Sequence, residues 1–317
     1  MAPQNELWTL TRRPDPALFY HREDPNDKRL GEVVLSDPAR YSSSDVVIVG
    51  CPQDEGVRRN MGRLGSAEAP RAIRAALYRA TDFDPDRRLT VFDLGDVDTA
   101  GTLEAVHARL HTVARDVLAS GKRLVVLGGG NDISHPDASA LRSIASPVLA
   151  FNIDTHFDVR ADAQMNSGTA YRRLLEEGVL EGEHFYEMAC QDFANSPVYE
   201  RYLKERGVTL WSLEEIRRET PTAVLGNIIN RSTAPLIFFG FDMDSVRSAD
   251  APGVSAPSPT GLSAEEAMEI ARLAGQEPRA RLFEITEMNP KYDIDGRTAR
   301  LAALMVRAYL KGCLDKM

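Results

Sequence analysis

Eight short apolar runs, rich in Val, Ile, Leu and Phe, recur along the chain. They occupy residues 45–50, 89–95, 122–130, 146–154, 184–190, 208–212, 235–242 and 281–287. Most do not alternate between apolar and polar positions, which is typical of strands buried on both faces of a sheet. The pattern therefore predicts eight strands.

The segments between these runs carry the period of amphipathic helices. In 103–119 one apolar face is formed by Val106, Leu110, Val113 and Val117, and in 298–311 another is formed by Leu301, Leu304, Met305 and Ala308. Gly312 follows the second pattern and is predicted to be its C-cap. Strand–helix alternation predicts an α/β fold: a single three-layer domain with a mainly parallel eight-stranded sheet and helices on both faces.

The first 45 residues break this pattern. They are dense in Pro, Asp and Arg, and they are predicted to form an irregular arm (1–45) packed on one domain that spans 46–317. No apolar run approaches the roughly 20 residues of a membrane helix, and the first 15 residues contain no apolar core typical of a secretory signal. The three cysteines are widely spaced, which favours a reducing compartment. We therefore expect a cytoplasmic protein.

The charge of the chain limits the classes of partner. Its net charge of −9 argues against nucleic acid or an anionic membrane as the main partner. A small anionic substrate is still compatible with this charge, because a single arginine can dominate the field inside a pocket.

Candidate chemistry lies where the predicted strands end. Ligands of parallel sheets bind at the carboxyl ends of the strands, and three of these ends carry polar residues: Asn131; Asp154, His156 and Asp158; Asp242 and Asp244. Residues i, i+2 and i+4 of an extended segment point to one side, so each acidic set can converge. Four clustered carboxylates repel unless a cation lies between them. Oxygen ligands with one imidazole favour Mn²⁺.

These motifs resemble those of the ureohydrolase family, which contains arginase, agmatinase and formimidoylglutamase. "DTHFD" (154–158) resembles its Asp-Ala-His-x-Asp motif, and "FDMDSVRSADAPGVSAPSPTGLS" (241–263) resembles its Asp-x-Asp motif with the following loop. "EITEMNP" (284–290) is similar to its Glu-x-Asn-Pro segment, and "GGGND" (128–132) stands where the family has Gly-Gly-x-His. The resemblance runs in order from about residue 46 to the C-terminus.

The resemblance implies two Mn²⁺ ions bridged by a hydroxide that attacks an amidine-type carbon. In the implied arrangement Asp154 and Asp242 bridge both ions. Asp158 and Asn131 complete the first site, and His156 and Asp244 complete the second. Asp158 would also carry the proton of the hydroxide to the leaving amine, and Glu287 would pair with the cationic nitrogens of the substrate. The family habit implies a homo-oligomer, a trimer or a hexamer.

Asn131 departs from the family pattern, because an amide oxygen is a weaker donor to Mn²⁺ than imidazole. The first site is therefore expected to bind metal weakly, unless His135 or Asp132 reaches in instead. A metal-poor, non-catalytic binding protein with the same fold remains the alternative to an enzyme. Two further histidines, His107 and His111, are four residues apart on the predicted helix 103–119, and we interpret them as packed or solvated.

Three features distinguish among the members of the family. Arg160 offers a bidentate grip on a carboxylate. The "NSGTAYRR" loop (166–173) resembles formimidoylglutamases in its "NSGT" part and has Tyr171 where arginase has a proton-shuttling histidine. The segments "DPNDKRLGEVV" (24–34) and "GCPQDEGVRRNMGRLGSAEAPRAIRAAL" (50–77) resemble the N-terminal region of formimidoylglutamases. Substrate contacts are accordingly expected from Arg160, from Asn166, Ser167, Gly168 and Thr169, and from Arg58 and Arg59 at the end of the first strand, although these last two could instead pair with Asp54 or Glu55.

The expected reaction is the hydrolysis of N-formimino-L-glutamate to L-glutamate and formamide, a step of histidine degradation. This substrate carries two carboxylates and an amidine-like carbon, so it needs cations at one end of the site and activated water at the other. Another ureohydrolase activity, agmatinase, guanidino-acid hydrolase or arginase-like, is the alternative.

Overall fold

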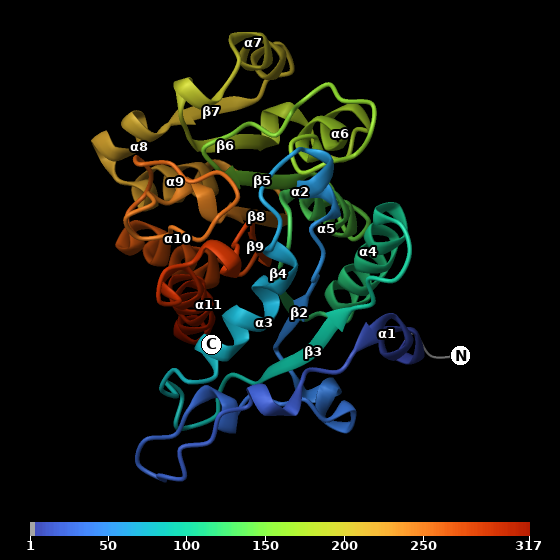
Figure 1. Ribbon diagram of the computed structural model, residues 1–317, viewed down its shortest axis with the longest axis vertical. Helices are drawn as coiled ribbons and strands as arrows, with labels where there is room; N and C mark the ends of the chain where they lie inside the picture. Colours follow the sequence, from blue (N-terminus) through green and yellow to red (C-terminus); the bar gives the residue numbers. More distant parts are fainter. Residues whose placement is uncertain (1–3) are drawn as a thin grey trace.

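A computed structural model describes residues 4–317 and contains one nine-stranded sheet (Figure 1). In chain order the strands are β1 (Thr11–Arg12), β2 (Val46–Gly50), β3 (Val91–Val97), β4 (Arg123–Leu127), β5 (Val148–Ile153), β6 (Phe185–Cys190), β7 (Thr209–Ser212), β8 (Leu236–Asp242) and β9 (Ala280–Thr286). Their spatial order is β1-β3-β2-β4-β9-β8-β5-β6-β7. The eight predicted strands and the mainly parallel sheet are confirmed.

The ninth strand, β1, comes from the N-terminal arm. Its two residues pair with β3 in antiparallel fashion, Thr11 opposite Val97 and Arg12 opposite Asp96. A two-residue strand has no hydropathy period to detect, so the apolar pattern could not predict it.

Helices cover both faces of the sheet. They are α1 (Gln4–Leu10), α2 (Glu55–Arg59), α3 (Ala69–Leu77), α4 (Leu103–Ala119), α5 (Ser134–Arg142), α6 (Ala170–Glu176), α7 (Pro197–Glu205), α8 (Leu213–Glu219), α9 (Pro221–Arg231), α10 (Ala264–Gln276) and α11 (Arg297–Asp315). In Figure 1, α3, α9, α10 and α11 lie on one side of the sheet, and α1, α4, α5 and α6 lie on the other. Each side has its own apolar core against the strands, so the three predicted layers are confirmed.

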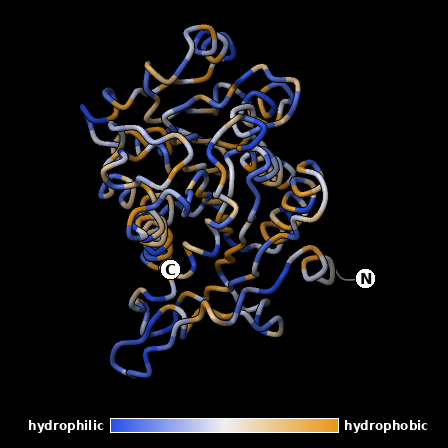
Figure 2. Tube along the Cα trace, in the orientation of Figure 1, coloured by the Kyte–Doolittle hydropathy of each residue, from blue (hydrophilic) through white to orange (hydrophobic). Residues whose placement is uncertain are grey.

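The helix that was predicted over 103–119 is α4, and its ends follow from local chemistry. Thr102 is the N-cap, and its side chain accepts a hydrogen bond from the backbone N–H of Ala105. Val106, Leu110 and Val113 are buried against the sheet. The helical tubes in Figure 2 alternate between hydrophobic and hydrophilic colours, as expected for helices with one buried face.

The predicted end of the last helix is wrong. Helix α11 continues through Gly312 to Asp315. A side chain at Gly312 would place its Cβ 2.3 Å from the backbone oxygen of Arg272, and a Cβ at Gly275 would lie 2.0 Å from that of Tyr309. The two glycines therefore let α10 and α11 pack closely, and this requirement, rather than helix termination, explains Gly312. None of the helices in residues 4–317 combines the length and the apolar character needed to cross a membrane.

Candidate metal centre

Four adjacent strands at the middle of the sheet, β4, β9, β8 and β5, deliver the polar residues to one edge. The residues at or next to their carboxyl ends are in register: Leu127 lies opposite Ile285, Ile285 opposite Phe241, and Phe241 opposite Ile153. Asn131, Glu287, Asp242 and Asp154 follow or end these strands. Because parallel strands that end in register bring the next residues to the same level, the four side chains meet at the carboxyl edge of the sheet.

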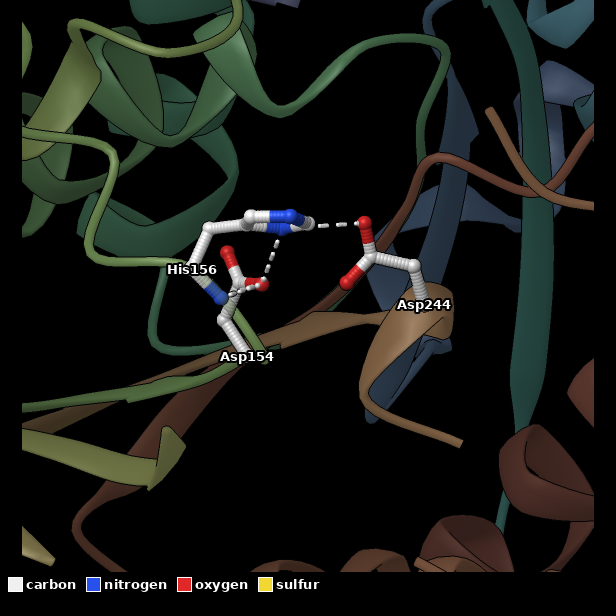
Figure 3. A group of neighbouring side chains, drawn as sticks. All are labelled: Asp154, His156 and Asp244. Atoms are coloured by element: carbon white, nitrogen blue, oxygen red, sulfur yellow. Dashed lines mark hydrogen bonds and ion pairs between the residues drawn. The ribbon is translucent and has the colours of Figure 1, made fainter. Parts of the chain in front are cut away.

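The acidic residues form two groups that could each hold a metal ion. Asp154, His156 and Asp244 make one group, and Asp154, Asp158 and Asp242 make the other; the candidate ligand atoms of each lie within 4.8 Å of one another. Figure 3 shows the His156 ring beside Asp154 and Asp244, with its Nδ1 3.4 Å and 3.2 Å from their carboxylate oxygens. Asp154 belongs to both groups, as a bridging ligand must, whereas Asp242 belongs to one.

The electrostatics of these groups call for a cation. Burial, reinforced by the charge of Asp244, raises the pKa of Asp154 to about 7. Burial and the charge of Asp154 raise the pKa of Asp158 to about 8, and the pKa of buried Asp242 is also raised well above its usual value. The charge of Asp244 raises the pKa of His156. Carboxylates that resist ionisation in this way become stable anions once a divalent cation compensates them, so the donor set fits two Mn²⁺ ions.

Two further features of the centre are costly to the folded state. A carboxylate oxygen of Asp244 and one of Glu287 are buried and make no hydrogen bond within residues 4–317. The backbones of Asp158 and Glu287 adopt left-handed conformations, with φ of 48° and 60°. Strain of this kind in non-glycine residues is typical of functional sites.

The side-chain amide of Asn131 is held in one orientation by hydrogen bonds that involve both of its polar atoms. Its Nδ2 donates hydrogen bonds to Asp154 (3.2 Å) and Asp158 (2.7 Å). Its Oδ1 accepts hydrogen bonds from the hydroxyls of Ser134 (2.9 Å) and Thr286 (3.0 Å). The oxygen that would bind Mn²⁺ thus faces the protein, and a metal-ligand role for Asn131 stays a prediction that requires the amide to turn over.

The two substitutes considered for Asn131 are directed elsewhere. His135 lies on α5, and its Nε2 pairs with Glu177 at 2.8 Å. Asp132 is buried, and it accepts a hydrogen bond from Gln53 (2.8 Å) while contacting His107 Nε2 (2.6 Å). Neither belongs to the two metal groups. The contact also gives His107 a buried acidic partner that its sequence neighbourhood did not reveal.

The centre opens into a cavity of about 510 Å³. Its lining includes His156, Asp158, Asp242, Asp244 and Glu287, together with Asn60, Arg63, Arg160, Ser167 and Tyr199. Glu287 is anchored by the backbone N–H of Asn131, which donates to its Oε1 at 2.9 Å. One cavity therefore joins the metal-binding residues to two guanidinium groups.

The structure does not bring Arg58 and Arg59 into this cavity. Arg58 pairs with Glu55 at 2.6 Å, and Arg59 pairs with Glu55 at 3.0 Å and with Glu104 at 2.6 Å. Both arginines were predicted to contact substrate, and the pairing with Glu55 that was the alternative is the one observed. Glu104 is distant in sequence, so its part in holding Arg59 could not be foreseen.

Arg160 and the "NSGT" loop occupy one side of the cavity. The backbone N–H of Arg160 donates to the oxygen of Gly168 at 2.8 Å, and the Arg160 guanidinium pairs with Asp162 at 3.0 Å. Of the loop, only Ser167 lines the cavity, and its hydroxyl accepts a hydrogen bond from Asn60 at 3.0 Å.

The other loop residues have structural surroundings. Asn166 accepts a hydrogen bond from the N–H of Gly168, and the N–H of Asn166 donates to the hydroxyl of Thr169. Tyr171 is fully buried, with its ring stacked on Phe185 at 5.1 Å between centroids. Since its side chain does not line the cavity, no proton-transfer group replaces the arginase histidine at this position.

Sequence reasoning missed Arg63 and two buried acids. Arg63 follows α2 and was hidden among the other arginines of 58–74, with no strand end to single it out. Glu187 and Glu284 lie fully buried in the middle of strands β6 and β9. Their signal was an acidic residue inside an apolar run, which is rare without a polar partner. Glu187 accepts a hydrogen bond from Asn152, and Glu284 lies 2.6 Å from the Ser134 hydroxyl oxygen.

Comparisons with known proteins agree with this geometry. The model of the arginase family matches residues 44–311. A formimidoylglutamase of Staphylococcus aureus is 32% identical over 313 residues, which covers 96% of this chain and 97% of that protein. The crystal structure of Trypanosoma cruzi formiminoglutamase with Mn²⁺ superposes with a TM-score of 0.86 at 36% identity, over 92% of this chain and 100% of that one. The Bacillus subtilis formimidoylglutamase structure gives a TM-score of 0.86 at 26% identity, over 93% and 95%. This chain belongs to the arginase family.

Proposed function

We propose that the protein is a manganese-dependent hydrolase that cleaves the C–N bond of N-formimino-L-glutamate, yielding L-glutamate and formamide. The observation that carries the proposal is the single cavity that joins the two acidic metal groups to Arg63 and Arg160. A formimino group requires activated water, and the two carboxylates of the substrate require cations. The names of the similar proteins support the same reaction.

The residues of the centre are proposed to have two roles, metal binding and proton transfer. Asp154, Asp158, His156, Asp242 and Asp244 would hold two Mn²⁺ ions, which would supply hydroxide at neutral pH by lowering the pKa of bound water. Asp154 and Asp242 would be shared by the two metal sites. Asp158 would also take the proton of the nucleophile and pass it to the leaving amine.

Glu287 is proposed to orient the formimino group. One of its oxygens is fixed by the N–H of Asn131, and the other is buried without a hydrogen-bond partner in residues 4–317. A substrate N–H would satisfy that second oxygen. Glu287 would thereby orient the amidine carbon beside the metal groups.

The alternative guanidino substrates fit less well. Arginine carries one carboxylate and agmatine none, so neither can pair with both guanidinium groups that line the cavity. Arginase is further disfavoured because buried Tyr171 occupies the position expected for its proton shuttle. The family resemblance also supports a homo-oligomer, a trimer or a hexamer, and three free buried cysteines support a cytoplasmic location.

Formamide release from N-formimino-L-glutamate, measured with and without added Mn²⁺, tests the proposal. We expect Mn²⁺-dependent turnover, with arginine and agmatine at least tenfold poorer in kcat/KM. Metal content should be measured on the same samples. Two bound ions without turnover of any of these substrates would favour a binding protein and would reject the proposed reaction.

A further inference from the structure

Arg63 lines the cavity and is held by two of its three guanidinium nitrogens. Its Nε donates to the backbone oxygen of Ser255 at 3.0 Å, and its Nη2 donates to the backbone oxygen of Val254. The guanidinium plane lies over the Tyr292 ring, 4.2 Å from its centroid. These contacts fix the group in one orientation and leave Nη1 with no hydrogen bond to any residue in 4–317.

The charge of Arg63 is unusual among the arginines near the cavity. Arg160 pairs with Asp162, and Arg59 pairs with Glu55 and Glu104. Arg63, in contrast, forms no ion pair with a carboxylate within residues 4–317, and both of its hydrogen bonds are to neutral carbonyl groups. It therefore brings an uncompensated positive charge to a protein whose net charge is −9.

The proposed substrate needs that charge. The four carboxylates of the two metal groups would balance the four positive charges of two Mn²⁺ ions, and Glu287 adds a negative charge that can pair with the cationic formimino group. The metal centre therefore offers no net attraction to the two carboxylates of the substrate. Two guanidinium groups that line the cavity, those of Arg63 and Arg160, can pair with these carboxylates.

We propose that Arg63 binds the side-chain carboxylate of the substrate, while Arg160 binds its α-carboxylate. This inference rests on the proposed function and names the residue that selects a dicarboxylate. The order follows from the chain: Arg160 is two residues from Asp158, beside the metal groups, and the α-carboxylate is the one nearer the formimino nitrogen. Arg63 enters the cavity from the turn after α2, and its free Nη1 offers a charge-assisted hydrogen bond to the more distant carboxylate.

The competing interpretation gives Arg63 a structural role only. Its bonds to Val254 and Ser255 link the turn after α2 to the loop that follows the metal ligand Asp244. Loss of such a brace would lower activity on every substrate alike. A lost carboxylate contact would lower activity only on substrates that carry the carboxylate, so substrate analogues separate the two roles.

The test compares Arg63→Met and Arg63→Lys with the wild type on three substrates. N-formimino-L-glutamate carries both carboxylates, N-formimino-L-glutamine lacks the side-chain charge, and N-formimino-4-aminobutyrate lacks the α-carboxylate. For Arg63→Met we expect kcat/KM to fall about 10- to 100-fold more on N-formimino-L-glutamate than on the glutamine analogue, as for a lost hydrogen bond between charged groups. Arg160→Met should show the mirror pattern, with its selective loss absent on the aminobutyrate analogue.

Arg71→Met is the matched control, because it removes one arginine from the same stretch. Arg71 is exposed, pairs with Asp15 and does not line the cavity, so its kcat/KM values should stay near those of the wild type.

Equal losses of Arg63→Met on all three substrates would overturn the inference. If that variant does not fold, Arg63→Lys is the test, because lysine keeps the positive charge but not the planar guanidinium group. A loss of kcat/KM confined to the substrates with a side-chain carboxylate supports the proposal. A uniform loss on all three substrates refutes it. Failure of the wild type to hydrolyse N-formimino-L-glutamate is a different result, which rejects the proposed function itself.

Discussion

Replacing Asp154 by Asn tests both the metal centre and its electrostatic cost. Asp154 is fully buried and belongs to both metal groups. An asparagine keeps the shape and can still accept the hydrogen bond from the N–H of His156. It cannot supply the charge that bridges two cations. We therefore expect the variant to lose Mn²⁺ binding and activity while it keeps the fold.

The metal-free variant should also be more stable than the metal-free wild type at high pH. Burial raises the pKa of Asp154 from 3.8 to about 7, so the ionised group disfavours the folded state. The sign follows from proton binding: between these two pKa values the folded state holds more protons, so stability falls as pH rises. At 1.36 kcal/mol per pKa unit, the cost is about 2 kcal/mol at pH 5 and about 4 kcal/mol above pH 7. Asn removes this cost.

Thermal unfolding in EDTA measures the effect. An unfolding entropy of about 0.7 kcal/mol per kelvin for a chain of this length converts 4 kcal/mol into a Tm rise of about 6 °C. His156 loses a neighbouring carboxylate in the variant, so a rise of about 2–6 °C at pH 8 and a smaller one at pH 5 are expected. Added Mn²⁺ should raise the Tm of the wild type alone.

Two outcomes would refute this reasoning. A metal-free variant no more stable than the wild type at pH 8 would show that burial of the Asp154 charge is not costly. Activity within tenfold of the wild type, or a retained Mn²⁺-dependent Tm shift, would remove Asp154 from the metal centre.

Two other substitutions test the remaining site predictions. Arg160→Ala should lose at least tenfold in kcat/KM on N-formimino-L-glutamate, because a charge-assisted bidentate contact disappears; full activity would show that Asp162, the partner of Arg160, already occupies its guanidinium. Asn131→His should raise the Mn²⁺ affinity of the first site about 10- to 100-fold, since imidazole is a better donor than an amide. Mn²⁺ occupancy at low Mn²⁺ concentration should then be higher, with activity kept or raised. His135→Ala should leave Mn²⁺ titration unchanged because His135 pairs with Glu177, and a lost ion would restore His135 as the substitute ligand.

The sequence by itself determined the strands and the residues at their ends. Uninterrupted apolar runs predict buried strands because burial on both faces leaves a local signature. The spacing of Asp154, His156 and Asp158 in one segment predicts that their side chains converge on a metal site. Family motifs added the roles, and all of this information lies within short stretches of chain.

Only the tertiary structure decided which distant residues meet. The order β4-β9-β8-β5 places Asn131, Glu287, Asp242 and Asp154 side by side, although 156 residues separate the first two. The direction of the Asn131 amide depends on Ser134 and Thr286, on two different elements.

The same holds for the arginines and for the last helix. Glu104 and Glu55 keep Arg59 out of the cavity, and the carbonyl groups of 254–255 hold Arg63 in its lining. Gly312 serves the packing of α11 on α10 rather than a helix end. The hydropathy pattern indicates whether a residue is buried, but not which residues it packs against. Contacts between residues far apart in sequence produce no periodic pattern in either segment. Such contacts are set by the packing of the whole domain.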